Sequence, residues 1–204
     1  MFGKLLITRH HETDWNKLGQ WQGRTDRHLT DYGKAQAALM GTLIAHVPLA
    51  CVYTSTLSRT HETAAAMLTS AHKETLPVIH APALDERDYG DYTGKNKWEM
   101  QKILGDDAFL RLRRGWNEPV PNGETLRDVY ERVVPYYMSD IVPRLQRTET
   151  VLIVAHGNSL RALTKYIENL SDDAVSSVEF TFGEVITYTF DENGRMIQKV
   201  IEQI

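Results

Sequence analysis

The most informative segment of the chain spans residues 150–163 and reads Thr150-Val151-Leu152-Ile153-Val154-Ala155-His156-Gly157-Asn158-Ser159-Leu160-Arg161-Ala162-Leu163. Its first six residues form an unbroken apolar run, which is typical of a β-strand that is buried on both faces. A helix is expected directly afterwards, from Ser159 to about Leu170, with the Ser159 side chain as its N-cap. A buried strand that is followed at once by a helix indicates an α/β protein.

The same alternation of strand and helix continues through the rest of the chain. Apolar runs predict strands at residues 4–8, 50–54, 78–81, 185–190 and 196–201. Helical patterns cover residues 31–46, 58–71 and 125–145, and Pro135 should kink the last of these or start a new segment. An Asn-Gly pair at residues 193–194 predicts a hairpin between the last two strands. The expected fold is a three-layer α/β sandwich, with a mostly parallel central sheet and helices on both of its faces.

Length and composition favour one globular domain over residues 1–204. The stretch at about residues 84–123 is dense in charge, glycine and aromatics, and we expect it to form a short insertion of helices and loops that caps the C-terminal ends of the strands. Hydrophobic residues make up 42% and charged residues 25%, which excludes an intrinsically disordered chain. The net charge of −4 argues against a nucleic-acid partner.

The sequence carries no recognisable signal for export or for membrane insertion. The apolar run at residues 5–7 is too short for a signal peptide, and nothing approaches the roughly 18 apolar residues of a membrane span. Cys51 is the single cysteine, so an internal disulfide is impossible, which fits a reducing compartment. We therefore expect a cytoplasmic protein without a membrane partner.

Two histidines stand at the ends of predicted strands. His10 follows the strand at residues 4–8, and His156 follows the strand at residues 150–155. Ligands of open α/β sheets bind outside the carboxyl ends of the strands, so these histidines are candidates for a shared site. An isolated histidine is more often a structural residue. Here, however, the neighbouring Arg9 offers a planar guanidinium that suits phosphate oxygens.

Basic residues recur at turns and within the predicted insertion. They are Arg59, Arg87, Lys97, Arg113 and Arg114. In an acidic protein, cations at such positions suggest a pocket for a small, multiply charged anion. An ordinary solvated surface is the alternative, and the pair at residues 113–114 would also suit the end of a helix, where the macrodipole favours positive charge. Spacing alone leaves both interpretations open.

Other chemistries have little support in the sequence. Both glycine-rich phosphate-loop patterns, of nucleotide and of dinucleotide sites, are absent. The His-Glu pairs at residues 11–12 and 61–62 lack the second histidine of a zinc-protease motif, and no metal site is expected. Ser159 does not lie in the Gly-x-Ser-x-Gly turn of hydrolases, and Cys51 is expected to pack inside a strand.

Three motifs resemble those of a known enzyme family. They are Arg9-His10-His11-Glu12-Thr13-Asp14-Trp15-Asn16, the block from Leu84-Asp85-Glu86-Arg87-Asp88-Tyr89-Gly90 to Lys97, and the His156 motif with its flanks. Together they resemble the histidine phosphatase superfamily. The second block, the Arg113-Arg114-Gly115 segment and the long His156 motif are more closely similar to the superfamily's phosphoglycerate mutase branch, which depends on 2,3-bisphosphoglycerate.

This resemblance implies a role for each matching residue. His10 would accept a phosphoryl group, Glu86 would act as general acid and base, and Arg9, Arg59 and His156 would stabilise the transferring charge. The other residues at positions of the implied site would bind the phosphorylated substrate: Asn16, Gln22, Gly23, Arg87, Tyr89, Lys97, Arg113, Arg114, Gly157 and Asn158. The resemblance also implies 2,3-bisphosphoglycerate as the priming phosphoryl donor, no metal, and a homodimer or homotetramer.

Three departures from the family pattern leave the reaction open. His11 stands where the family has glycine, Gln22-Gly23 replaces the usual Thr-Gly of the mutases, and the segment between Arg114 and Thr125 is short. We expect a mutase that interconverts 3-phosphoglycerate and 2-phosphoglycerate, as in glycolysis and gluconeogenesis. A phosphatase acting on a small phosphorylated metabolite is favoured by Gln22. A weakly active protein that binds such a metabolite is favoured by His11.

Overall fold

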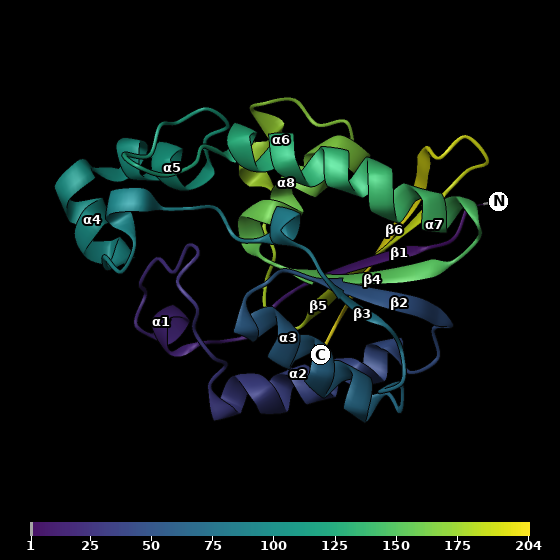
Figure 1. Ribbon diagram of the computed structural model, residues 1–204. Coiled ribbons are helices and arrows are strands. Elements are labelled where there is room, and N and C mark those ends of the chain that lie inside the picture. Colours follow the sequence, from purple (N-terminus) through teal and green to yellow (C-terminus); the bar gives the residue numbers. More distant parts are fainter. Residues whose placement is uncertain (1) are drawn as a thin grey trace.

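A six-stranded mixed sheet forms the centre of the molecule (Figure 1). The computed structural model describes residues 2–204. The strands are β1 (Leu5–Arg9), β2 (Leu49–Thr54), β3 (Val78–His80), β4 (Thr150–Ala155), β5 (Glu184–Phe190) and β6 (Met196–Gln203). They lie in the order β3-β2-β4-β1-β5-β6, in which the first four are mutually parallel and β5 and β6 are antiparallel to their neighbours. The predicted α/β fold with a mostly parallel sheet is therefore confirmed.

Helices cover both faces of this sheet (Figure 1). They are α1 (Asp14–Lys17), α2 (Asp31–Ile44), α3 (Ser58–Ser70), α4 (Lys97–Leu104), α5 (Asp106–Arg114), α6 (Leu126–Tyr136), α7 (Val142–Gln146) and α8 (Gly157–Ile167). Short 3₁₀ turns lie at Pro82–Leu84, Gly90–Tyr92 and Ala174–Ser177. Helices α2 and α3 pack on one face, and α6, α7 and α8 pack on the other. No helix within residues 2–204 has the length and the apolar character of a membrane span.

Alternation along the strands builds a hydrophobic core on each face. Leu5 and Ile7 of β1 point to the cluster under α6 and α8, whereas Leu6 points to the cluster under α2 and α3. Every residue of β4 is buried, as the apolar run predicts for a strand covered on both sides. Cys51 of β2 is likewise buried in the core. The central strands are thus held rigidly, which fixes the positions of the residues that follow them.

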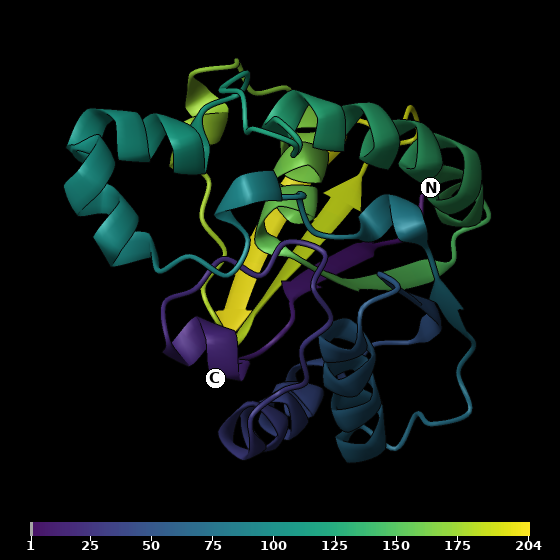
Figure 2. The ribbon, with the colours of Figure 1, turned by 60° about the vertical axis from the view of Figure 1, so that its left-hand side comes forward.

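A third apolar cluster lies between the segment that was expected to be an insertion and the loop after α1. Helices α4 and α5 stand beside the sheet on the side toward which β1 and β4 run (Figures 1 and 2). Residues before and within this segment pack together there: Trp21, Tyr89, Met100, Phe109, Leu112 and Val120. Because Trp21 comes from the loop after α1, the cluster ties that loop to α5. The two segments therefore form one wall at the end of the sheet.

The structure corrects two details of the helix predictions. His156, and not Ser159, is the N-cap of α8; Ser159 is the third helical residue, and its Oγ accepts a hydrogen bond from the His156 N–H at 3.1 Å. The expected helix at residues 125–145 is α6, a π-helical turn at Tyr137–Ile141 and α7 in succession. Pro135 lies inside α6 and does not end it. The irregularity is the π-helical turn, which begins at Tyr137, directly after α6.

Candidate active site

Strand pairing brings the two predicted histidines together. β1 and β4 are parallel neighbours with Arg9 opposite Ala155, and the His10 N–H donates to the Ala155 carbonyl at 2.9 Å. His10 and His156 therefore leave the sheet at the same edge. Their ring centroids are 5.0 Å apart, and the side chains are 2% and 0% exposed, respectively. The structure thus places at one point two rings that are 146 residues apart in the sequence.

The hydrogen bond of His10 determines which ring nitrogen is free. Nδ1 lies 2.7 Å from the carbonyl oxygen of His11. Because a carbonyl only accepts, Nδ1 carries the proton and Nε2 keeps its lone pair. Burial, followed by the positive charges of Arg59 and Arg9, lowers the pKa of His10 well below its usual value. The ring is therefore neutral near pH 7, with a nucleophilic nitrogen beside the pocket.

His156 is held as a neutral ring by two neighbours. The Arg59 Nε–H donates to its Nδ1 at 3.3 Å, so Nδ1 has no proton, and Nε2 donates to the Ser55 Oγ at 2.8 Å. Burial, and then the charges of Arg59 and nearby groups, lowers its pKa well below the usual range. This ring lies behind His10 and does not line the pocket itself. It acts on the pocket through Arg59 and His10, which it contacts.

Arg59 is a buried cation with its orientation fixed by backbone carbonyls. Its Nη2 donates to the Gly23 carbonyl at 2.8 Å and its Nη1 to the Thr25 carbonyl at 3.0 Å. Gly23 has φ +52°, a left-handed conformation that suits glycine, and this turn aims its carbonyl at the guanidinium. Burial lowers the pKa of Arg59 to about 10, so the side chain stays charged at neutral pH. It presents a fixed positive charge next to His10.

Arg9 supplies a second buried cation. Its Nη1 donates to the Phe180 carbonyl at 3.2 Å, and its guanidinium lies 4.5 Å from the centroid of the Phe182 ring. Its Nε is buried without a hydrogen-bond partner among residues 2–204. Arg9 also lines the pocket, where its guanidinium presents a positive charge to an anionic ligand.

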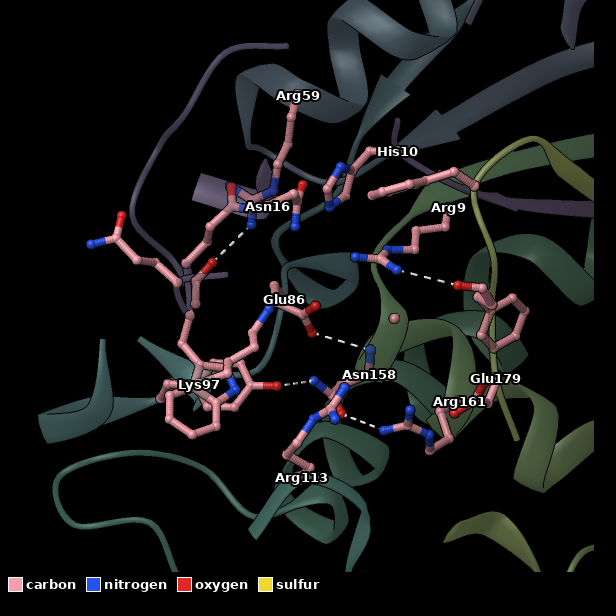
Figure 3. A pocket seen from close by; sticks show the side chains of 18 of the residues that line it. Arg9, His10, Asn16, Arg59, Glu86, Lys97, Arg113, Asn158, Arg161 and Glu179 are labelled. Carbon is pink, nitrogen blue, oxygen red and sulfur yellow. Dashed lines mark hydrogen bonds between the residues drawn. The ribbon is translucent and has the colours of Figure 1, made fainter. Parts of the chain in front are cut away.

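Glu86 lies in the middle of the pocket, between the end with His10 and the end with Arg113 and Arg161 (Figure 3). Its Oε1 accepts hydrogen bonds from the N–H groups of Arg87, at 2.8 Å, and of Asn158, at 3.1 Å. Asn158 is fixed in turn, because its amide donates to the Tyr89 hydroxyl at 3.0 Å and accepts from Arg161 at 2.7 Å. Only one carboxylate oxygen is used by these bonds. The other, Oε2, remains available to a ligand.

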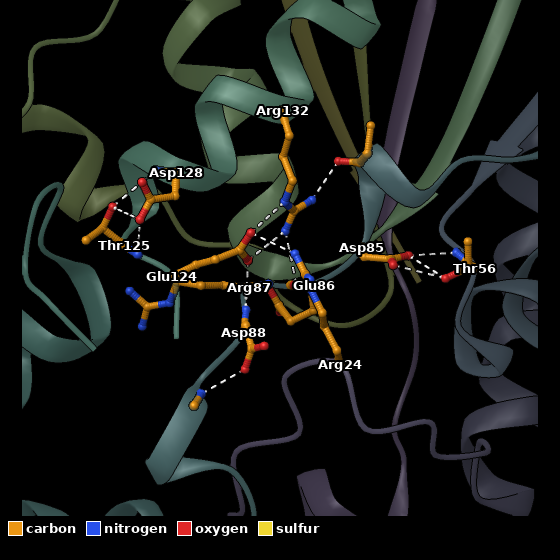
Figure 4. Close-up of polar contacts among 12 residues, drawn as sticks. Arg24, Thr56, Asp85, Glu86, Arg87, Asp88, Glu124, Thr125, Asp128 and Arg132 are labelled. Atoms are coloured by element: carbon orange, nitrogen blue, oxygen red, sulfur yellow. Dashed lines mark hydrogen bonds and ion pairs between the residues drawn. The ribbon is translucent and has the colours of Figure 1, made fainter. Parts of the chain in front are cut away.

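The network behind Glu86 comes from α6 (Figure 4). Arg132 donates to the carbonyl of Glu86 at 3.1 Å and to that of Ala83 at 2.7 Å. It also forms an ion pair with Glu124 at 3.0 Å, and Glu124 accepts from the Asp88 N–H at 2.9 Å. The segment that carries Glu86 is thus bound on both sides of the residue. This arrangement positions the carboxylate without touching the pocket.

His10, Arg9, Arg59, Glu86 and Asn158 line a cavity of about 480 Å³. It brings together thirteen of the fifteen residues predicted from the sequence, namely Arg9, His10, Asn16, Gln22, Gly23, Arg59, Glu86, Tyr89, Lys97, Arg113, Arg114, Gly157 and Asn158. Six cationic side chains and two carboxylates line it. Burial, followed by the charges of Arg9 and Arg113, lowers the pKa of Lys97 to about 8. The cavity is therefore suited to a ligand with more than one negative charge.

Two predicted residues lie outside the cavity wall. One is His156, described above. The other is Arg87, which was expected to bind substrate but is completely buried behind Tyr89, its guanidinium 4.5 Å from the ring centroid. Its Nη2 donates to the Leu112 carbonyl at 2.8 Å. In this structure Arg87 supports Tyr89 and α5.

Sequence reasoning missed several lining residues. These are Gln20, Trp21, Arg161, Glu179, Phe180, Thr181 and Phe182. Arg161 lies within the motif after β4, where its position one helical turn beyond Asn158 was a usable signal. Residues 179–182 precede β5 and carry no pattern of their own, so only the tertiary structure could bring them to the cavity.

The unusual His11 turns away from the cavity. Its backbone is not in the left-handed region, so glycine is not needed there. The ring stacks on Phe182 with 4.9 Å between centroids, and its Nδ1 accepts from the Glu12 N–H at 2.8 Å. It therefore adds no imidazole to the wall. Gln22, by contrast, does line the cavity, and its Oε1 is buried without a partner among residues 2–204.

The chain matches the family model for the histidine phosphatase superfamily (branch 1) over residues 5–203. It therefore belongs to that superfamily, and the membership inferred from the three motifs is confirmed.

Its relatives are similar over almost the whole chain. The chain is 40% identical over 199 residues to the 2,3-bisphosphoglycerate-dependent phosphoglycerate mutase of Bartonella quintana, with 97% of each chain covered. It is 37% identical to the protein of that name from Corynebacterium diphtheriae, over 96% of this chain and 89% of the other. The solved structure of Bacillus stearothermophilus YhfR has a TM-score of 0.83 and 31% identity, over 96% of this chain and 94% of that one. The predicted enzyme class is confirmed by these named relatives.

Proposed function

We propose that the protein interconverts 3-phosphoglycerate and 2-phosphoglycerate through a phosphohistidine at His10. The observation that carries this proposal is the free Nε2 of a neutral, buried His10, which lines the same pocket as Arg9, Arg59 and Glu86. The relatives named as phosphoglycerate mutases support the same reaction. When bound, 2,3-bisphosphoglycerate would supply the phosphoryl group that first loads His10.

The chemistry follows from the positions of the side chains. The His10 Nε2 lone pair attacks phosphorus; a bond from phosphorus to nitrogen forms as the bond from phosphorus to the substrate oxygen breaks. Arg9 and Arg59 stabilise the negative charge on the transferring group, which is the main demand of phosphoryl transfer. Glu86 gives a proton to the departing oxygen through Oε2. In the reverse transfer it takes the proton from the hydroxyl that attacks the phosphohistidine.

The cap segment completes the ligand site in this proposal. Lys97 is the first residue of α4, and Arg113 and Arg114 end α5, so residues at about 84–123 supply the cations farthest from the sheet. These three would bind the second anionic group of the ligand. Asn16, Gln22, Gly23, Tyr89, Gly157 and Asn158 would surround its carbon skeleton and remaining oxygens.

A phosphatase is the second candidate function. Its support is Gln22, which stands where the mutases have threonine and which lines the cavity wall. A third candidate, a protein that only binds such metabolites, loses its main support because His11 packs outside the cavity.

One assay separates the candidates. The protein is given 3-phosphoglycerate with a catalytic amount of 2,3-bisphosphoglycerate, and 2-phosphoglycerate and inorganic phosphate are followed together. We expect 2-phosphoglycerate to form with little phosphate, and His10→Ala to abolish its formation. The matched control is His46→Ala, which removes an exposed histidine outside the cavity and should leave the rate unchanged. Phosphate without isomer would instead establish the phosphatase, and turnover by the His10 variant would reject the phosphohistidine.

A further inference from the structure

The cavity contains one carboxylate to which the proposed mechanism gives no role. Glu86 exchanges protons, but Glu179 also lines the wall, in the segment between the last 3₁₀ turn and β5. It forms an ion pair with Nη2 of Arg114. The Glu179 side chain is 63% exposed and that of Arg114 is 15% exposed. The Glu179 carboxylate thus binds the Arg114 guanidinium, which the proposed substrate would need for its second anionic group.

The position of Glu179 is fixed by its neighbours in the chain. The carbonyl of Val178 accepts hydrogen bonds from Arg114 Nη1 and from Arg161 Nε, each at 3.1 Å. On the other side, the Phe180 carbonyl accepts from Arg9 at 3.2 Å. The backbone before and after Glu179 is therefore anchored to three arginines of the cavity. Its carboxylate is part of the wall and not of a freely moving loop.

Arg114 does not need Glu179 for its orientation, because the bond from Nη1 to the Val178 carbonyl remains without it. What Glu179 adds is a negative charge. A ligand anion that approaches Arg114 must either displace this carboxylate or accept its repulsion at short range, and both weaken binding. The effect falls on the ligand's second anionic group and not on the phosphoryl group at His10.

We infer that Glu179 determines specificity: it lowers the affinity of the cavity for ligands that place a second anion at Arg114. The inference rests on the proposed function in that the ligand carries two anionic groups. Figure 3 places His10 and Arg59 at one end of the cavity and Arg113, Arg161 and Glu179 at the other, with Glu86 between them. A ligand with a single phosphate bound at the His10 end escapes the penalty. Glu179 therefore reduces the margin by which the cavity prefers a ligand with two anionic groups to a ligand with one.

The test measures binding without chemistry. In a His10→Ala background, titration calorimetry compares the chain with and without Glu179→Gln. The ligands are 3-phosphoglycerate, which has two anionic groups, and inorganic phosphate, which has one. We expect Glu179→Gln to tighten the binding of 3-phosphoglycerate about two- to fivefold, as befits one ion pair whose carboxylate is largely exposed, and to leave the binding of phosphate unchanged. The difference should shrink when the ionic strength is raised to about 0.5 M.

Glu118→Gln is the matched control, because Glu118 pairs with Arg111 of α5 at 3.6 Å and neither residue lines the cavity. It should change neither affinity. Unchanged or weaker binding of 3-phosphoglycerate by the Glu179 variant would overturn the inference, as would an equal change for both ligands. Because calorimetry measures binding without turnover, its result can still be interpreted if the protein proves not to be an isomerase. A negative calorimetric result likewise does not affect the outcome of the isomerase assay.

Discussion

At the scale of single residues, burial and neighbouring positive charges set the protonation states of the two histidines. His10 and His156 are neutral because they lie beside Arg59 inside the protein. Arg59 keeps its proton under the same conditions because its ordinary pKa is so high. A neutral imidazole next to a permanent cation is the pairing that the proposed phosphoryl transfer needs. The residue types were readable from the sequence, but their charges depend on burial.

Lys97 gives the cavity a dependence on pH. Its pKa of about 8 means that the ammonium loses its proton as the pH rises through 8, whereas an ordinary lysine would stay charged to about 10. A neutral Lys97 no longer attracts the substrate, so we expect KM for 3-phosphoglycerate to rise between pH 7 and 9.5, by up to about tenfold per pH unit above 8. Initial rates across this range measure the effect.

Lys97→Arg is the informative variant for this prediction, because its guanidinium stays charged throughout the range. Its KM should remain nearly flat between pH 7 and 9.5. An equally steep rise in the arginine variant would show that another group titrates.

At the scale of elements, local patterns located most helices and strands. The strand at residues 150–155 was predicted with the bounds it has, and α2 begins at Asp31, as expected, with Thr30 as its N-cap in the structure. The errors occur where tertiary contacts outweigh local preference. Ser159 is a good N-cap residue, but β4 ends at Ala155, so the helix begins earlier and His156 takes the cap position. Pro135 is tolerated within α6, which packs against α8 and the core.

Helix α6 has a functional task that its sequence does not reveal. Arg132 holds the carbonyl of Glu86 and pairs with Glu124 (Figure 4). We expect Arg132→Ala to lower kcat by about ten- to a hundredfold with little change in KM, because small displacements of a proton-transfer group are costly. It should also lower the free energy of unfolding by about 1.5–3 kcal/mol.

Steady-state kinetics and urea unfolding measure the two effects of this substitution. Arg127→Ala is the control on the same helix, since Arg127 forms an exposed pair with Glu131 at 2.9 Å. It should alter neither quantity appreciably. If Arg132→Ala changed stability but left kcat intact, the role of Arg132 in positioning Glu86 would be refuted.

At the scale of the whole molecule, the buried histidines couple stability to pH. Both have native pKa values well below their unfolded value of about 6.5, so below pH 6.5 the unfolded chain binds protons that the native protein does not. The contribution of these neutral rings to the free energy of unfolding is therefore at its maximum above pH 6.5, and it decreases as the pH falls below that value. The loss is at most about 1.4 kcal/mol per pH unit for each ring.

Urea unfolding between pH 5 and 8 tests this coupling. His10→Gln should flatten the decline in stability on the acid side, whereas His46→Gln, at an exposed position, should leave the slope unchanged. Equal slopes for the wild-type chain and the His10 variant would contradict the assignment of a low native pKa to His10.

The sequence by itself determined the class of fold, the two histidines and most of the cations, because strand and helix periodicity and residue chemistry are local properties. Only the tertiary structure decided that β1 lies beside β4 and that residues 179–182 close the wall, since strand order and loop paths depend on contacts between distant segments. The same is true of Arg87. Its positive charge suggested a ligand-binding residue, but in the folded chain it is buried behind Tyr89. Burial depends on the whole folded chain. It determines whether a side chain can contact a ligand and whether that side chain is charged.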